Sequence, residues 1–399
     1  MFSDQILNFE NLFIPESFAL EEIKDVLERV KDKHRLSPEE AKYLLSLNPL
    51  EDKEIYYKTI DASTVTKNSL FNSNIFAIAP LYVTSICQEH CVYCNYRAEN
   101  KDKEIQRVRL SNEELAMEVD FLAKKGLRVI ELVYATDPFI TINDVSNHIK
   151  ITIDVLSNHG GGIVGINSRP YSVEDYRKLK DAGLDFVVLW QETYDKTSYK
   201  ELHAGNKEKT DFYYRLNSPN RMIEAGIENI GLGVLSGLSN WRKDWYMLMS
   251  HVSYLLQEYK DKIKTVILGI PRLKPAAGAL LKETPFIPDD REYLLAISLF
   301  NLFLPTALPF VNTRESWDMC VEIAKGGGTL FTFDCKTIPG GYALGRHGYQ
   351  FPTYDFDVNK HVEKLNKVNL NPIFDWNFQK LQSKLKLGKD FSLCFNSSP

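Results

Sequence analysis

Residues 75–94 read IFAIAPLYVTSICQEHCVYC, an apolar run that ends in three closely spaced cysteines. A continuous apolar run is typical of a strand that is buried on both faces of a parallel sheet. The chain repeats this pattern, with amphipathic stretches between the runs. The seven further runs lie at 127–135, 161–167, 184–191, 227–235, 263–271, 308–313 and 327–333. The pattern therefore predicts eight parallel strands separated by helices.

The stretches between the runs have the pattern of amphipathic helices. Three clear examples are 111–126, 172–183 and 218–226, which end at Gly126, Gly183 and Gly226. Glycine after the last helical turn is a typical C-cap. Eight strand–helix units predict an α/β fold, a (β/α)8 barrel of the TIM type, whose usual length is about 250 residues. A doubly wound open sheet is the alternative, but no G-x-G-x-x-G motif follows the first strand.

Two segments flank the predicted barrel. Residues 1–75 are polar and helical, and Ser37 is expected to cap a helix ahead of Pro38. Residues 346–399 are expected to form a loop and helices that cover one end of the barrel. We therefore predict an N-terminal helical extension, a barrel over 76–345 and a C-terminal cap segment, without a further domain boundary.

Composition and charge narrow the class of protein. The 399 residues are 44% hydrophobic and 25% charged, with a net charge of −5, which is ordinary for a globular protein. An acidic balance argues against nucleic acid as the main partner. No apolar run approaches the ~20 residues of a membrane span, and the N-terminal stretch lacks the pattern of a signal peptide. We expect a cytoplasmic protein that acts on a small molecule.

In a (β/α)8 barrel, chemistry takes place at the carboxyl ends of the strands. The residues expected there are Cys87, Cys91 and Cys94 after the first strand, Thr136 and Asp137 after the second, Asn167–Arg169 after the third, Gln191 and Glu192 after the fourth, Arg272 after the sixth, Thr313–Glu315 after the seventh and Thr332–Lys336 after the eighth. Polar and charged groups should thus converge on one mouth.

The three clustered cysteines point to iron–sulfur chemistry. The spacing C-x3-C-x2-C supplies three thiolates, and no fourth cysteine or paired histidine stands at zinc spacing, although a zinc loop or chance clustering is the alternative. Soft thiolates suit an iron–sulfur cluster. Three cysteines on a [4Fe–4S] cluster leave one iron open, which S-adenosylmethionine can bind through its amino nitrogen and carboxylate. A reduced cluster can then cleave the sulfonium to methionine and a 5′-deoxyadenosyl radical.

With the aromatic Tyr93 before the third cysteine, this motif resembles the signature of the radical SAM superfamily. Over about residues 76–345 the chain resembles one group more closely, the aromatic amino acid lyases. That group contains tyrosine lyases of thiamine synthesis (2-iminoacetate synthase) and of [FeFe]-hydrogenase maturation, and a tryptophan lyase that makes 3-methyl-2-indolic acid. The matching stretches are PLYVTSIC (80–87), QETYDKTSYKELH (191–203), DFYYRLNSPNRMIEAGIENIGLGVLSGL (211–238), PRLKPAAGA (271–279), NTRES (312–316) and TIPGGYA (337–343).

The resemblance implies roles for individual residues toward the cofactors. Cys87, Cys91 and Cys94 match the cluster ligands, and Tyr93 matches the aromatic that packs on adenine. Glu192 and Arg215 match contacts to S-adenosylmethionine, unless they form a structural ion pair. The predicted cofactor contacts also include Arg169, Gln191, Thr136 and Asp137, because these residues lie at the same mouth.

Three further residues are predicted to face the substrate. Arg314 resembles the arginine that anchors the substrate α-carboxylate as a bidentate fork. Thr332 stands where the group has a serine, and Tyr82 matches a tyrosine of the active-site floor. Two of them have a structural alternative. Arg314 alternatively pairs with a neighbouring carboxylate, and Tyr82 alternatively packs in the core.

Arg272 has no assigned role in this pattern, and the alternative to a functional role is a barrel-lining charge that is merely paired. His203 and His251 are expected on helix surfaces.

The chain departs from the group at two places. After the second strand, Ala135-Thr136 replaces a Gly-Glu pair that accepts the amino group of S-adenosylmethionine, so Asp137 or Thr136 must take that role. After the eighth strand, the bulkier residues 332–336 replace small ones, which indicates an altered substrate or product. Within them, Asp334 and Lys336 are expected to neutralise each other at the rim.

We therefore predict a radical SAM carbon–carbon lyase that converts L-tyrosine to 2-iminoacetate and p-cresol. L-tryptophan is the alternative substrate, and a different small-molecule substrate is a weaker alternative. The hydrogenase maturase is disfavoured, because it carries a second C-x2-C cluster where this tail has only Cys394. An electron donor such as flavodoxin or ferredoxin is expected as a partner, with an enzyme of the same biosynthetic pathway, and neither nucleic acid nor membrane.

Overall fold

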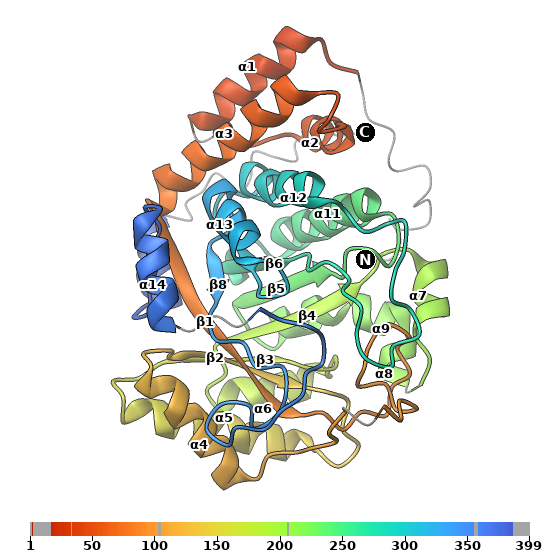
Figure 1. Ribbon diagram of the computed structural model, residues 1–399, viewed down its shortest axis with the longest axis vertical. Helices are drawn as coiled ribbons and strands as arrows, with labels where there is room; N and C mark the ends of the chain where they lie inside the picture. Colours follow the sequence, from red (N-terminus) through yellow and green to blue (C-terminus); the bar gives the residue numbers. More distant parts are fainter. Residues whose placement is uncertain are drawn as a thin grey trace.

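The computed structural model describes residues 2, 17–32, 34–102, 105–205, 207–354 and 358–385. Eight parallel strands close into a barrel, so the predicted (β/α)8 fold of the TIM type is confirmed (Figure 1). The strands are β1 (Asn74–Thr84), β2 (Val129–Tyr134), β3 (Ile163–Asn167), β4 (Phe186–Glu192), β5 (Asn229–Val234), β6 (Thr265–Gly269), β7 (Leu308–Val311) and β8 (Leu330–Thr332). All eight apolar runs of the sequence form these strands.

The barrel closes at β1, which pairs with β8 on one side and with β2 on the other. Side chains alternate between the inside and the outside of each strand. The inward positions nearer the amino ends of the strands are apolar, and they fill the barrel as a packed core: Ile78, Val129, Ile163, Val188, Ile267, Leu308 and Leu330. Polar side chains are thereby left to the carboxyl ends.

Helices surround the barrel. They are α4 (Asn112–Lys124), α5 (Ile142–Ser157), α6 (Val173–Asp181), α7 (Lys196–Leu202), α8 (Lys207–Thr210), α9 (Phe212–Leu216), α10 (Ser218–Glu224), α11 (Trp241–Tyr259), the 3-10 turn η3 (Lys260–Lys262), α12 (Asp290–Phe303) and α13 (Trp317–Gly326). The glycines predicted as C-caps adopt positive φ angles, 85° at Gly126, 101° at Gly183 and 87° at Gly226. Only glycine adopts these angles without steric cost, which explains the sequence signal.

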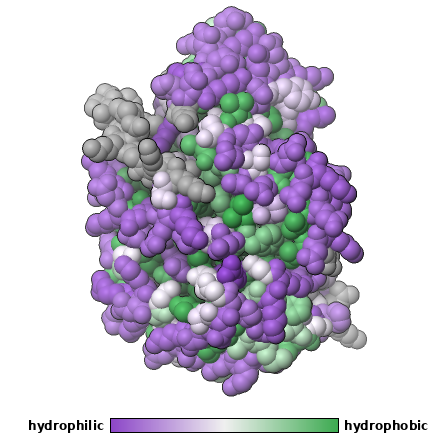
Figure 2. All heavy atoms as spheres, turned by 90° about the vertical axis from the view of Figure 1, so that its left-hand side faces the viewer, coloured by the Kyte–Doolittle hydropathy of each residue, from purple (hydrophilic) through white to green (hydrophobic). Residues whose placement is uncertain are grey.

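The described part of the N-terminal extension is helical. It forms α1 (Leu20–Lys31), α2 (Pro38–Ser46) and α3 (Lys53–Phe71), and Figure 1 shows α1 and α3 stacked above α12. Ser37 caps α2 as predicted, since its side chain accepts a hydrogen bond from the Glu40 amide at 3.2 Å. Apolar residues face inward, and the outer face seen in Figure 2 is mainly hydrophilic. The extension is therefore a helical layer packed on the barrel helices.

The C-terminal segment contacts both ends of the barrel, so the expectation that it covers one end is wrong. It contributes α14 (Val358–Lys367), β9 (Asn371–Ile373) and α15 (Phe378–Leu385). β9 pairs with the start of β1, and Trp376 donates a 2.9 Å hydrogen bond to the Ala77 carbonyl, which plugs the amino end of the barrel. Residues 350 and 351 lie at the opposite mouth.

Two earlier expectations are not tested by this architecture. The three segment boundaries stay predictions, and Cys394 lies outside the described residues. In the part of the chain that the structure describes, no helix is both long and apolar enough to span a membrane.

Candidate active site at the carboxyl end of the barrel

A cavity of about 250 Å³ opens at the carboxyl ends of the strands. Eleven of the thirteen predicted site residues line it: Tyr82, Cys87, Cys91, Tyr93, Cys94, Thr136, Arg169, Glu192, Arg215, Arg314 and Thr332. The other two, Asp137 and Gln191, do not. The barrel thus brings together residues that lie up to 250 positions apart in the chain.

The three-cysteine loop is held by its backbone. The amide of His90 donates to the Ala204 carbonyl at 3.1 Å, and the amide of Val92 donates to the Leu202 carbonyl at 3.2 Å. These bonds tie the loop after β1 to the segment after α7. The loop is therefore held against the C-terminal end of α7 by protein contacts alone, and its three cysteines line one cavity.

On one side of the cavity, Glu192 stands at the end of β4 in an unusual conformation. Its φ angle is 76°, and a bulge between Trp190 and Glu192 breaks the regular alternation of the strand. The bulge lets both of these side chains face the cavity, while Gln191 between them does not line it. The Gln191 side chain is buried, and its Nε2 has no hydrogen-bond partner among the described residues. Strain and bulges of this kind re-aim side chains at functional sites.

Glu192 belongs to a buried cluster of charges. Lys209 Nζ lies 2.7 Å from its carboxylate and Arg215 Nη2 lies 3.4 Å from it. Burial alone would raise the pKa of Glu192, but the two cations outweigh it and lower that pKa to about 2. The predicted pairing of Glu192 with Arg215 is thus present, and Arg215 also donates to the Trp190 carbonyl at 2.8 Å. All three side chains still line the cavity, so the ion cluster does not exclude a binding role.

Tyr93 is fixed by a histidine. Its hydroxyl lies 2.7 Å from His203 Nε2, and His203 Nδ1 lies 2.8 Å from the Tyr199 carbonyl. Because Nδ1 must donate to that carbonyl, Nε2 accepts the Tyr93 hydroxyl. Burial lowers the pKa of His203 to about 3, which keeps the ring neutral.

The expectation that His203 and His251 lie on helix surfaces is therefore wrong. His251 is buried as well, against Phe2 and with its ring nitrogen 2.9 Å from the Tyr194 hydroxyl. Each ring has a hydroxyl partner from a distant element, Tyr93 for His203 and Tyr194 for His251, which a helical pattern alone does not reveal.

The two residues after β2 separate in the structure. Asp137 faces Arg109, which donates to both of its oxygens at 2.7 and 2.6 Å, and it also accepts the Thr84 hydroxyl at 2.7 Å. Thr136 lines the cavity instead. Of the two residues that stand in for the missing Gly-Glu pair, the geometry favours Thr136.

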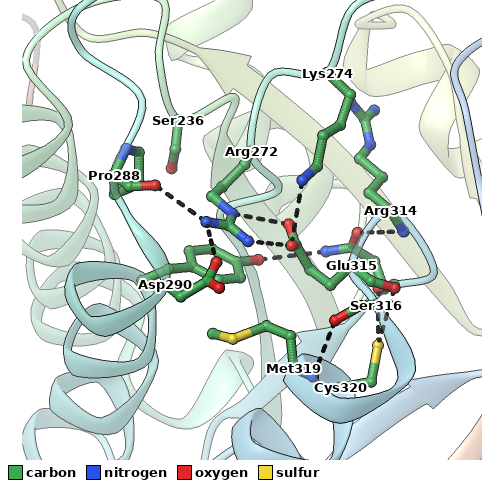
Figure 3. A network of polar contacts seen from close by, with 12 residues as sticks. Ser236, Arg272, Lys274, Pro288, Asp290, Arg314, Glu315, Ser316, Met319 and Cys320 are labelled. Carbon is green, nitrogen blue, oxygen red and sulfur yellow. Dashed lines mark hydrogen bonds and ion pairs between the residues drawn. The ribbon is translucent and has the colours of Figure 1, made fainter.

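On the other side of the cavity, Arg314 has no carboxylate partner among the described residues. The Cζ of its guanidinium lies over the Phe351 ring, 3.5 Å from the ring centroid. Figure 3 shows that Arg314 and the next residue, Glu315, point in different directions. Glu315 is bound by Arg272 and by Lys274, at 3.0 and 3.4 Å respectively. Arg272 is thus a partner of an ion pair, whereas Arg314 is left facing the cavity.

The remaining predicted substrate residues are hydrogen-bonded. The Tyr82 hydroxyl donates to Gln350 Oε1 at 2.8 Å, and the Thr332 hydroxyl donates to the Val311 carbonyl at 3.1 Å. In the divergent stretch after β8, Cys335 lines the cavity with Thr332.

Asp334 points away from the cavity to Lys125, at 2.6 Å, and its contact with Lys336 is longer, at 4.0 Å. The expected neutralisation of Asp334 by Lys336 is therefore secondary to a bond with Lys125. Only residues 332 and 335 carry the divergence of this stretch into the cavity itself.

Comparisons with known proteins identify the family of this chain. Residues 81–248 match the model of the radical SAM superfamily. The chain is 32% identical over 354 residues to the 2-iminoacetate synthase of Salmonella typhimurium, which covers 86% of this chain and 85% of that protein. It belongs to the aromatic amino acid lyase group of the radical SAM superfamily. The protein is therefore a radical SAM lyase, an enzyme that uses a [4Fe–4S] cluster and S-adenosylmethionine.

Two further proteins are similar to this radical SAM lyase, one in structure and one in sequence. The FeFe-hydrogenase maturase HydG from Carboxydothermus hydrogenoformans superposes with a TM-score of 0.80 at 27% identity, over 92% of this chain and 82% of that one. The 3-methylornithine synthase of Methanosarcina acetivorans is 27% identical, over 90% of this chain and 96% of that protein. The fold is thus shared by enzymes whose names indicate different products.

The cysteines of the radical SAM lyase fit a cluster better than a single metal ion. Among the described side chains, no three His, Cys, Asp or Glu residues are close enough to hold one ion. Ligands of a [4Fe–4S] cluster bind separate irons and need not meet at one point. Burial raises the pKa of the thiols, to about 11 for Cys87 and about 12 for Cys91. Iron supplies the positive charge that keeps buried thiolates ionised.

The sequence did not point to several residues that line the cavity of the lyase. Lys209 lies in the short helix α8, and Gln350 and Phe351 lie in the C-terminal segment. None of these follows a strand, so the rule used to find the mouth does not find them. Glu131 is different, because a carboxylate within the apolar run at 127–135 is a visible signal.

Proposed function

We propose that this radical SAM lyase cleaves the Cα–Cβ bond of L-tyrosine to give 2-iminoacetate and p-cresol. The observation that carries the proposal is Arg314, whose guanidinium has no carboxylate partner in the described structure and faces the cavity that holds the three cysteines. A free amino acid offers the carboxylate that this guanidinium lacks. The relatives named 2-iminoacetate synthase support the same reaction.

The cofactor side of the cavity would hold and orient the cofactors. Cys87, Cys91 and Cys94 would bind three irons of the cluster. When bound and reduced, the cluster supplies the electron that splits S-adenosylmethionine into methionine and a 5′-deoxyadenosyl radical. Tyr93 offers a ring to the adenine, and its bond to His203 sets the orientation of that ring. The remaining predicted contacts on this side are Thr136, Arg169, Glu192 and Arg215, and neither Asp137 nor Gln191 is retained as a direct contact.

The substrate side would hold the amino acid. Arg314 binds its α-carboxylate as a fork, and Thr332 and Tyr82 close the pocket around it. Clamping the carboxylate would fix the position of the amino group beside the cofactor side of the cavity, where the bound cofactors would supply the radical that removes a hydrogen atom from nitrogen. The Cα–Cβ bond then breaks, with 2-iminoacetate leaving on one side. The 4-hydroxybenzyl fragment takes one electron from the reductant and one proton to become p-cresol.

A different amino acid substrate is a second candidate. The similarity to a 3-methylornithine synthase over 96% of that protein favours it. L-tryptophan remains the alternative within the aromatic lyases. All these substrates need a clamped carboxylate, so Arg314 does not discriminate among them.

Partners follow from the chemistry. The enzyme acts on a small molecule and needs a one-electron reductant, for which we propose a flavodoxin or a ferredoxin. We also propose that an enzyme of the same pathway consumes the product, because an imine hydrolyses readily in water.

An anaerobic product assay tests the proposal. The reconstituted enzyme is reduced with dithionite in the presence of S-adenosylmethionine, and L-tyrosine, L-tryptophan and L-lysine are offered separately. Glyoxylate, formed by hydrolysis of 2-iminoacetate, together with p-cresol in the tyrosine reaction supports it. An indole product from tryptophan, or a product from lysine alone, would overturn the choice of tyrosine.

A further inference from the structure

Glu131 is a carboxylate in the wall of the cavity, midway along β2. It is only 4% exposed, yet it lines the cavity. Its one partner in the described structure is the amide of Asn167 on β3, which donates to Oε1 at 3.0 Å. No lysine, arginine or histidine of the described residues forms an ion pair with it.

This carboxylate is costly for the fold where it stands. Its inward neighbours on β2 are Val129 and Val133, so an aliphatic side chain would suit the same position. Burial raises the pKa of Glu131 to about 7, the direction expected for an acid without a cation beside it. A buried carboxylate with one free oxygen stabilises a protein only when a further donor meets it. The neighbouring strands supply no side-chain donor at this level, because the residues paired with Glu131 are Pro80 on β1 and Gly165 on β3.

Glu131 and Arg314 share the cavity without forming an ion pair. Both groups influence the pKa of Tyr82 and the pKa of Cys335. The charge of Glu131 raises each pKa, and the charge of Arg314 lowers it. The two charged groups reach the cavity from different elements, β2 and the loop after β7. A ligand that fills the cavity meets both side chains, because both line it.

The wall of the cavity also carries apolar groups. Val133, Trp190 and Phe310 line it, and the rings of the latter two meet edge to face with centroids 5.8 Å apart. The indole of Trp190 lies against Gly233 and Gly269, where an added Cβ would be 2.3 and 2.5 Å from it. The cavity thus offers a guanidinium, an apolar surface and a carboxylate. An amino acid with a ring and a hydrogen-bond donor on that ring presents the complementary groups.

We propose that Glu131 determines specificity by accepting a hydrogen bond from the phenolic hydroxyl of the substrate whose α-carboxylate is held by Arg314. This inference rests on the proposed function. It assigns Glu131 to the phenolic end of the substrate, whereas Arg314 binds the α-carboxylate at the other end. A site built to bond a hydroxyl rejects the analogue without it, because its own polar group is then left unpaired. Glu131 therefore selects tyrosine over phenylalanine.

Ligand binding without turnover tests the inference. L-tyrosine and L-phenylalanine are titrated calorimetrically into the reconstituted holoenzyme with S-adenosylmethionine and no reductant. Hydrogen bonds to a charged group favour tyrosine by about 10–100-fold in the wild type. Glu131→Leu is expected to abolish that preference with little change for phenylalanine. Glu131→Gln keeps the shape and the bond to Asn167, and it should lose about 3–10-fold for tyrosine.

A matched control separates this role from loss of a buried acid. Glu118 on α4 is fully buried and accepts the amides of Tyr342 and Leu344, each at 2.9 Å, outside the cavity. Glu118→Gln should leave the tyrosine-to-phenylalanine ratio unchanged.

The outcomes distinguish the inference from the proposed function. If the wild type cleaves tyrosine but the ratio is the same in both Glu131 variants, the inference is wrong and the proposed function stands. Equal losses for both ligands would assign Glu131 a structural role and also overturn the inference. If the wild type binds neither aromatic acid, or binds L-lysine in a manner that needs Glu131, both fall.

Discussion

The two sides of the cavity differ in whether their charged side chains form ion pairs. On the cofactor side, the Glu192 carboxylate lies between two cations, Lys209 and Arg215, each within 3.4 Å of it. On the substrate side, Arg314 and Glu131 face the cavity with an aromatic ring and an amide as their neighbours. The charges of the first set are paired in the free enzyme, whereas Arg314 and Glu131 form no ion pair with any described residue.

This difference separates preorganisation from recognition. A cluster of paired charges holds its geometry before the cofactor binds, which favours a fixed orientation of the reacting atoms. A buried charged group without an ionic partner does not stabilise the fold, and it is available to bind a ligand. The contrast predicts that mutations on the cofactor side change stability, and that mutations on the substrate side change affinity.

The largest effect is expected for Glu192→Gln. Removing this carboxylate charge leaves Lys209 and Arg215 buried together, which should cost about 3 kcal/mol of unfolding free energy. Urea unfolding of the apo-protein at pH 7 measures it. Because the pKa of Glu192 is depressed to about 2, its contribution is present above the unfolded value of 4.5 and is lost as the pH falls toward 2. If the stability difference between the wild type and Glu192→Gln does not shrink over this range, the cofactor side does not stabilise the fold in this way.

Arg314→Lys should do the reverse. A lysine keeps the charge but loses the bidentate fork and the guanidinium contact with Phe351, so kcat/KM for tyrosine should fall about 100-fold. The free energy of unfolding should stay within about 1 kcal/mol of the wild type, because no carboxylate of the described residues loses a partner. Arg177→Lys, at an exposed position of α6, is the control. A large loss of stability in Arg314→Lys would show that Arg314 also stabilises the fold of the free enzyme, as the charges of the cofactor side do.

A smaller effect is expected from pH. Since the pKa of Glu131 is raised to about 7, the side chain is mostly neutral at pH 6 and mostly ionised at pH 8. A carboxylate accepts a hydrogen bond more strongly than a carboxylic acid, so tyrosine should bind up to about tenfold more tightly at pH 8. Calorimetric titrations at both values measure the change. Glu131→Gln should abolish it, and phenylalanine should show none; a rise shared by phenylalanine would assign the titration elsewhere.

The strands and most of the mouth could be predicted from the sequence because they follow one rule. Each apolar run of the barrel ends where a polar residue must face the cavity, and Cys87, Thr136 and Arg314 all obey it. The rule failed at Gln191, because a bulge in β4 turns its neighbours to the cavity instead. It also could not place Gln350, which comes from a segment without periodic pattern.

Gln350 bridges the two sides, and it gives the smallest and sharpest prediction. Its Nε2 donates to Cys94 Sγ at 3.5 Å, while its Oε1 accepts the Tyr82 hydroxyl at 2.8 Å. A hydrogen bond to a cluster thiolate stabilises the more negative, reduced state and raises the reduction potential. Gln350→Leu should therefore lower the midpoint potential by about 20–40 mV in a titration followed by electron paramagnetic resonance, the equivalent of one weak hydrogen bond. Tyr82→Phe frees Oε1 and should give a smaller shift in the same direction. If Tyr82→Phe changes tyrosine binding but leaves the potential unaltered, the two sides are independent; if it moves both, Gln350 couples them.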